Sequence, residues 1–268
     1  MNWLRHIAIL AGGCLFAAAG EPASSPMVPI EGGVYRRPLE KDGRTREVDD
    51  FRLDTRQVTN AEFLAFVLAH PEWRRSKVKR LFADKGYLLK WSGDTGLGAG
   101  APPESPVVCV SWFAARAFLK TVGKRLPTVD EWEFAARADT KSIDANLDPD
   151  FKAKILDWYS RPEPPVLPAA GSQEPNIYGV SGMHGIVWEW TDNFVSAMTS
   201  GEARADGTLS AQQFCGGGGA DPNQATEYAN FMRMAFRSSL KGDFCLPGLG
   251  FRGAMDSEIP TANPIPKP

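Results

Sequence analysis

The sequence predicts an α+β fold: an irregular, loop-rich single domain. The chain has 268 residues, enough to bury a sizeable core. It contains 21 Pro and 26 Gly, which favour turns, and 8 Trp and 15 Phe, which supply bulky core side chains. Short helix signals are mixed with strand-like runs, and neither strict alternation nor a helical-bundle pattern dominates. With 43% hydrophobic residues, disorder is excluded for the bulk of the chain.

The amino terminus predicts export to the periplasm. Residues 1–20 carry Arg5 and then an apolar run at 7–19, and small residues precede Glu21. This is the pattern of a cleaved signal peptide. An uncleaved anchor and lipidation of Cys14 remain open. A Pro/Ser linker follows at 21–29, and no second apolar run follows it, so no membrane span is expected in the mature chain.

Three helices are predicted from their caps. Thr59 and Glu62 form a capping box whose helix ends before Pro71. Ser111 caps a second helix. A second capping box opens the third helix, with Thr128 as its N-cap. Residues 32–35 indicate an early strand, 145–175 are long, Pro-rich and poorly periodic, and Gly and aromatic residues dominate from 176 onward.

Charge and cysteine content limit the function classes. The sequence contains 30 Lys and Arg residues and 32 Asp and Glu residues, so there is no excess of basic residues to neutralise nucleic-acid phosphates. The mature chain keeps three cysteines. In an oxidising compartment Cys215 and Cys245 are a candidate disulfide, whereas Cys109 lies in an apolar run and is expected to be a buried thiol.

Three blocks of sequence carry a family resemblance. They are Val58-Thr59-Asn60-Ala61-Glu62-Phe63; Pro106-Val107-Val108 through Ser111-Trp112 to Gly123-Lys124-Arg125-Leu126-Pro127-Thr128 and Glu131-Trp132-Glu133; and Met183-His184-Gly185 with Val187-Trp188-Glu189-Trp190-Thr191, ending in Gly250-Phe251-Arg252. In this order they resemble the formylglycine-generating enzyme (sulfatase-modifying factor) family. The resemblance covers residues 30–254 and leaves a Pro-rich tail at 255–268. It implies one domain of the C-type-lectin-like kind.

The family's oxidases use a copper-binding cysteine pair just before an Arg-rich strand. The matching stretch here is 228–238, and the cysteine positions fall on Gln224 and Ala229. Neither residue supplies the thiolate that a soft copper site needs. The resemblance therefore implies no catalytic residues and no formylglycine-generating activity. His70 and His184 are too few for the histidine-held iron of the wider family.

The resemblance also implies a structural calcium site. Its ligands would be Glu189 and the backbone at His184, Gly185 and Val187, because hard oxygen donors suit calcium. The alternative is that Glu189 is a buried carboxylate satisfied by hydrogen bonds. For His184, a structural role competes with a catalytic one.

The sequence looks like an exported, cysteine-lacking branch of the family. The expected function is a catalytically inactive periplasmic regulator that promotes activation of a membrane Ser/Thr kinase controlling type VI secretion. Its expected partner is the periplasmic sensor domain of that kinase, with an outer-membrane lipoprotein as a further candidate partner. The alternatives are a periplasmic oxidoreductase maturing a peptide siderophore of the pyoverdine type and an accessory factor for nitrite reductase.

Overall fold

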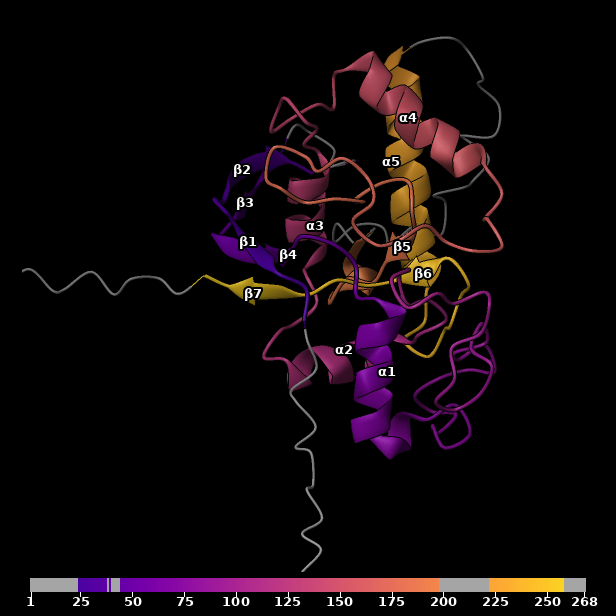
Figure 1. Cartoon of the computed structure of the whole chain (residues 1–268). Helices are drawn as coiled ribbons and strands as arrows, with labels where there is room; N and C mark the ends of the chain where they lie inside the picture. The colour runs from indigo at the N-terminus through magenta and orange to yellow at the C-terminus, as the bar shows by residue number, and fades with distance from the viewer. Residues whose placement is uncertain (1–23, 38, 40–43, 198–221, 258–268) are drawn as a thin grey trace, which may run out of the picture.

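The fold is mixed helix and strand, and the part of the chain that the structure describes contains short sheets and five α-helices (Figure 1). The computed structural model describes residues 24–37, 39, 44–197 and 222–257. Its elements are β1 (Met27–Ile30), β2 (Gly33–Arg36), β3 (Thr45–Val48), β4 (Phe51–Asp54), α1 (Asn60–Ala69), η2 (Pro71–Trp73), α2 (Trp112–Thr121), α3 (Val129–Ala136), α4 (Pro149–Ser160), β5 (Trp188–Glu189), η3 (Phe194–Ala197), α5 (Pro222–Ser239), β6 (Leu249–Gly250) and β7 (Ala254–Asp256). Within the described ranges, no helix is long and apolar enough to cross a membrane.

Short antiparallel pairs bring the two ends of the described chain together. β4 lies between β1 and β7, with Leu53 opposite both Val28 and Ala254. β2 and β3 form a separate antiparallel pair. The inner face of the three-stranded sheet packs against α3, where Trp132 and Phe134 join the same buried cluster as Leu53.

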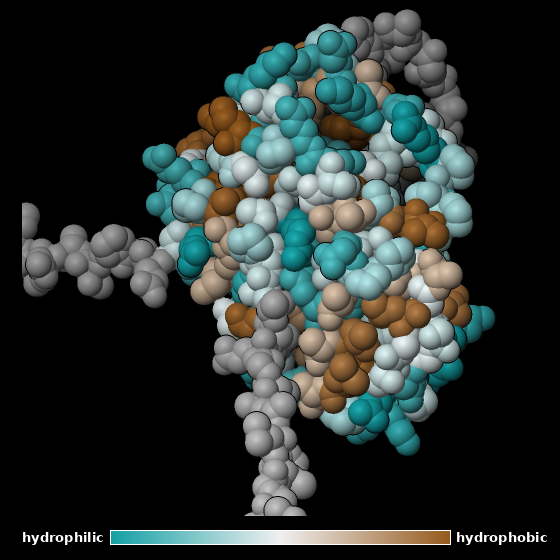
Figure 2. Space-filling model, in the orientation of Figure 1, coloured by the Kyte–Doolittle hydropathy of each residue, from teal (hydrophilic) through white to brown (hydrophobic). Residues whose placement is uncertain are grey.

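A second core is built from aromatic rings between α1 and α2. The Phe63 ring lies 5.3 to 6.3 Å, centroid to centroid, from four other rings, those of Phe66, Trp91, Phe118 and Phe251. Edge and tilted contacts of this kind add to the free energy gained from burying the rings. On the face shown in Figure 2 polar side chains predominate, and apolar side chains gather over α1, whose Leu68 is exposed.

The predicted helix starts are confirmed by their hydrogen bonds. Thr59 and Thr128 each accept from the backbone N–H three residues on, and Glu62 and Glu131 accept from the cap backbone in return. Ser111 Oγ accepts from Ala114 N–H at 3.1 Å. The early strand is also found, as β2.

Two expectations are wrong. The poorly periodic segment 145–175 contains a regular helix, α4, because Asp148 caps it and Pro149 fits the first helical position. The stretch 228–238, expected as a strand by resemblance, lies within the helix α5. That stretch has no Gly or Pro after Pro222 and is rich in Ala, Met and Arg, which favour a helix.

Strands β5 and β6 place the central residues of the site. They pair in parallel, with Trp188 opposite Leu249 and Glu189 opposite Gly250. A Cβ atom at Gly250 would lie 2.7 Å from the Val107 carbonyl oxygen, so only glycine allows this approach. Arg252 follows two residues later and reaches Glu189.

Candidate ligand-binding site

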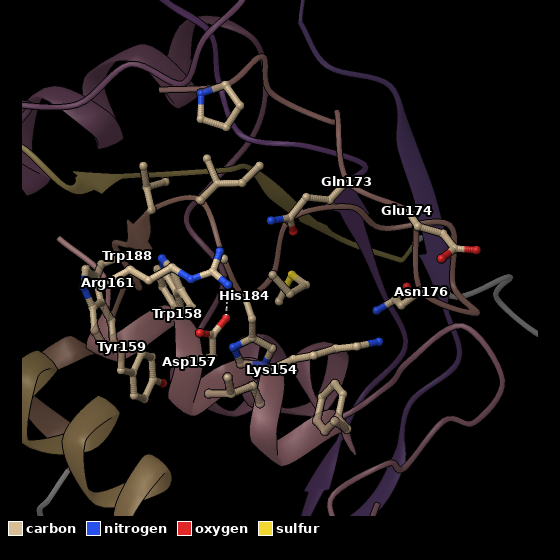
Figure 3. A pocket seen from close by; sticks show the side chains of 18 of the residues that line it. Lys154, Asp157, Trp158, Tyr159, Arg161, Gln173, Glu174, Asn176, His184 and Trp188 are labelled. Carbon is tan, nitrogen blue, oxygen red and sulfur yellow. Dashed lines mark hydrogen bonds and ion pairs between the residues drawn. The ribbon is translucent and has the colours of Figure 1, made fainter. Parts of the chain in front are cut away.

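An open pocket of about 1030 Å³ lies beside α4 and β5 (Figure 3). We call it the open pocket. Its lining comes from α4, the segment around His184, the strand residue Trp188, and Phe236 of α5. The side chains labelled in Figure 3 come from several elements around this space. Its volume is at the upper end of the range for small-ligand sites and is large enough for a peptide segment.

Four aromatic rings form one wall of the open pocket. Trp188 stacks on Tyr159 with centroids 4.9 Å apart, and its ring lies 5.2 Å from Trp158 and 4.6 Å from Phe236. Trp158, Tyr159 and Trp188 are each partly exposed. Half-buried aromatic side chains of this kind are the usual anchors of protein interfaces.

Two acidic residues that line the open pocket, Asp157 and Glu163, form ion pairs with basic residues. Asp157 of α4 forms an ion pair with Arg161, the residue that follows the end of the helix; a dashed line joins the pair in Figure 3. Glu163 forms an ion pair with Lys90. Since these groups are solvent-exposed in part, they contribute little to stability and can exchange partners with a ligand.

His184 lies at the base of the open pocket as a neutral hydrogen-bond acceptor. Its Nε2 lies 3.0 Å from the Ala136 carbonyl, which can only accept, so this nitrogen carries the proton. Its Nδ1 is buried without a partner. Burial, and then the positive charge of Arg233, lowers the pKa of His184 to about 3. His184 therefore stays uncharged near neutral pH, and its unprotonated Nδ1 is enclosed by protein.

Buried ion pairs fix the elements behind the pocket. Glu133 of α3 accepts from Arg233 at 2.7 and 2.6 Å and also from Arg237, both on α5. Burial would raise the pKa of Glu133, but the charges of Arg233 and Arg237 outweigh it and lower the pKa to about 2. Arg237 also stacks 4.2 Å over the Trp132 ring. These arginines tie α5 to α3.

Glu189 is buried behind the open pocket with a full set of donors. Its two oxygens accept from Gln57 at 2.7 Å, from Trp132 at 2.8 Å and twice from Arg252 at 2.8 Å. The side chains of Glu189 and Arg252 have no exposed surface. The carboxylate is thus neutralised by a guanidinium and hydrogen-bonded on both oxygens.

This geometry does not fit the expected calcium site. His184, Gly185 and Val187 line the open pocket, whereas Glu189 is turned into the core. One nearby oxygen, Gln57 Oε1, is buried without a partner, but calcium would have to displace Arg252 from the carboxylate. In the described part of the chain, no three His, Cys, Asp or Glu side chains gather as a metal site. The calcium site that the sequence predicted is not tested by these contacts, and metal analysis of the purified protein tests it.

The family model that matches this chain is the sulfatase-modifying factor enzyme 1-like domain, over residues 15–257. The chain belongs to the sulfatase-modifying factor family. The fold described above, a single mixed domain with short strands, is the fold expected from that membership.

Proteins with different names resemble this chain. A formylglycine-generating enzyme of Streptomyces coelicolor is 31% identical, over 78% of this chain and 79% of that protein. An inactive Cα-formylglycine-generating enzyme 2 of Bos taurus is 29% identical, over 70% and 76%. The serine/threonine-protein kinase pkn1 of Chlamydia caviae is 28% identical, over 65% of this chain but only 28% of the kinase.

The two family cysteine positions lie on α5. Ala229 is 4% exposed and does not line the open pocket. Gln224 lies in the first turns of the same helix. In the ranges described, the thiols are Cys109 and Cys245, both buried, and burial raises the pKa of each. Cys215 lies outside the described residues, so the Cys215–Cys245 disulfide stays a prediction.

Sequence reasoning missed several residues of the site. Gln57 and Trp132 hydrogen-bond Glu189 from 132 and 57 positions away, and no local pattern signals such pairing. Phe236 was taken as part of a strand, which hid its contact with Trp188. The sequence does not show whether Trp158 and Tyr159 are buried or exposed, and the structure places both on the pocket wall.

Proposed function

We propose that this protein is an exported, redox-inactive member of the sulfatase-modifying factor family that binds a segment of a partner protein in the open pocket. Through that contact it promotes activation of a membrane Ser/Thr kinase controlling type VI secretion. One observation carries the proposal. The pocket is large and walled by aromatic rings, while the family's cysteine positions hold Gln224 and Ala229.

The lining of the open pocket supports peptide binding. Trp158, Tyr159 and Trp188 offer apolar faces that lose little side-chain entropy on binding. Polar side chains from other elements, among them Gln173 and Asn176, line the same space and can hydrogen-bond the backbone of an extended segment. An aromatic wall combined with polar side chains is the composition expected of a recognition site.

The link to a kinase rests on two supports. The pkn1 kinase of Chlamydia caviae contains a stretch similar to this chain, so domains of this kind occur joined to Ser/Thr kinases. The predicted signal peptide at 1–20 would place the protein on the periplasmic side, where the sensor domain of a membrane kinase lies.

A binding experiment tests the proposal directly. Residues 21–268 are titrated by calorimetry with the purified periplasmic domain of the membrane kinase from the same organism. The expected dissociation constant is roughly micromolar, as for transient signalling contacts. Trp158→Ala should weaken binding about tenfold or more. Leu147→Ala is the matched control, because Leu147 is 85% exposed and lies outside the open pocket.

The competing functions give different results. If no kinase domain binds and a siderophore precursor accumulates in a gene-deletion strain, the oxidoreductase alternative replaces the regulator. Loss of nitrite reductase activity in that strain, again without kinase binding, would favour the accessory-factor alternative.

A further inference from the structure

Residues 71–94, which follow α1, carry an excess of positive charge. They include seven Lys or Arg and three Asp or Glu residues, a net charge of +4 in a chain whose formal net charge is −2, so the rest of the chain is negative overall. We call residues 71–94 the basic segment. In Figure 1 it forms the purple loops to the right of α1, away from strands β2 and β4.

Exposed basic side chains of this segment have no ion-pair partner in the described part of the chain. Lys79, Arg80 and Lys85 are all exposed, and none of them forms an ion pair with a described carboxylate. Two of the acidic residues of the segment, Asp84 and Asp94, accept hydrogen bonds from backbone N–H groups nearby. The positive charge is therefore open to an anionic partner outside the chain.

A tight turn presents a leucine among these charges. The Phe82 N–H donates to the Lys79 carbonyl at 2.8 Å, so Arg80 and Leu81 occupy the corner of the turn. Phe82 anchors the turn, because its ring lies 6.2 and 5.5 Å, centroid to centroid, from two other aromatic rings. Leu81 is instead 75% exposed. The turn thus holds an apolar side chain out in solvent beside a basic one.

Another strongly exposed leucine, Leu147, has different surroundings. No Lys or Arg lies within four positions of Leu147 in the sequence, whereas three Asp residues do. Within four positions of Leu81 there are four Lys or Arg residues and one Asp. A single exposed leucine needs no explanation, but its combination with an unpaired basic cluster is specific to the basic segment.

The chemistry of this surface favours a lipid bilayer over a protein partner. Membrane-surface binding strengthens with buried apolar area and with attraction between Lys or Arg and anionic lipids, and the turn offers both. Protein interfaces, in contrast, are depleted in Lys, and Leu is under-represented among their hot spots.

We propose that the basic segment binds the surface of an anionic phospholipid bilayer. Leu81 enters the boundary between headgroups and acyl chains, while Lys79 and Arg80 contact lipid phosphates. No residue of the segment lines the open pocket, so the inference concerns a different surface and does not depend on the kinase.

Vesicle co-sedimentation tests this inference. Residues 21–268 are mixed with vesicles of equal parts phosphatidylglycerol and phosphatidylethanolamine, or with vesicles of phosphatidylcholine alone. Binding is expected to the anionic vesicles only, and it should weaken as sodium chloride is added. Lys79→Ala/Arg80→Ala should weaken binding about tenfold or more. Leu81→Ala should weaken it about fivefold, because less apolar surface is buried.

Each variant has a matched control. Arg36→Ala/Arg52→Ala removes the same charge from exposed residues of β2 and β4, on another part of the surface, and should bind as the native protein does. Leu147→Ala removes an even more exposed leucine, at 85%, and should also leave binding unchanged. All four variants change exposed side chains, so their melting temperatures should match that of the native protein.

Three results would overturn the inference. They are the absence of binding to anionic vesicles, equal binding to phosphatidylcholine vesicles, and native binding by either basic-segment variant. If vesicles do not bind and Lys79→Ala/Arg80→Ala instead weakens binding of the kinase domain in calorimetry, the segment docks a protein and the lipid inference fails. Vesicle binding without kinase binding would leave this inference standing and contradict only the proposed function.

Discussion

Glu189 and Arg252 form a buried ion pair at the meeting point of segments far apart in the sequence. Arg252 also donates to the backbone carbonyls of Asp54 and Ser181, so it joins β4 to the loop before β5. The motifs around residues 188 and 252 could be read from the sequence. Their pairing could not, because it depends on the parallel register of β5 and β6. A buried lysine such as Lys152 is equally invisible, since in sequence it looks like the exposed Lys154.

The first prediction concerns calcium at Glu189. Because Arg252 neutralises the carboxylate, a calcium chelator should leave the melting temperature unchanged, and elemental analysis should find no bound calcium. Glu189→Ala should cost about 3–5 kcal/mol of stability by leaving Arg252 buried and unpaired. A melting temperature that falls in chelator and recovers with calcium would restore the calcium site.

The second prediction concerns pH and His184. Its pKa is lowered by burial to about 3, well below the value near 6.5 of an unfolded histidine. Between these values the unfolded chain binds a proton that the folded chain does not, so stability falls as pH drops from about 6.5 toward 3. The loss from this group is at most about 1.4 kcal/mol per pH unit. Urea unfolding across this range should show a steeper loss in the native protein than in His184→Gln. Equal slopes would mean that His184 titrates normally.

At the scale of elements, caps were predictable and tertiary context was not. The capping boxes at Thr59 and Thr128 each join residues three positions apart, so the sequence alone was enough to locate the starts of α1 and α3. Helix α4 was missed because its apolar face is narrow; Lys152 and Ile155 are its buried residues. Helix α5 was taken for a strand by analogy, although its composition favours a helix.

The third prediction concerns the cap of α3. This helix carries Trp132 and Glu133, which hold Glu189 and the two arginines of α5 in place. Thr128→Ala removes a cap that accepts from Glu131 N–H, and should cost about 1–2 kcal/mol. Thr140→Ala, an exposed threonine outside any helix, is the control and should cost little. Chemical denaturation of the two variants measures the difference, and equal losses would contradict the role of the cap.

At the scale of the whole molecule, family membership was predictable from the order of three sequence blocks. The sequence did not predict the open pocket. The open pocket is assembled from α4, α5, β5 and the segment around His184, and two of these elements were not expected. The pocket wall therefore emerged only from the packing of α4 against α5 (Figure 1).

The fourth prediction concerns redox chemistry. Residues 21–268 should not convert a cysteine in a sulfatase-type peptide to formylglycine, with or without copper. The reason is that Ala229 and Gln224 cannot form a bis-thiolate site. Mass spectrometry of the peptide measures the loss of sulfur, with an active formylglycine-generating enzyme as the positive control. Conversion above the copper-only blank would mean that the catalytic cysteine positions have been assigned wrongly.

The central claim is that the open pocket, without redox thiols, controls a kinase. The most direct measurement is phosphorylation of the kinase's cytoplasmic target in a strain that lacks this gene. The account predicts low phosphorylation and reduced type VI secretion in that strain. Both should be restored by the native gene and by Leu147→Ala but not by Trp158→Ala, with all three proteins present at equal levels. Normal phosphorylation in the deletion strain, or full rescue by Trp158→Ala, would contradict it.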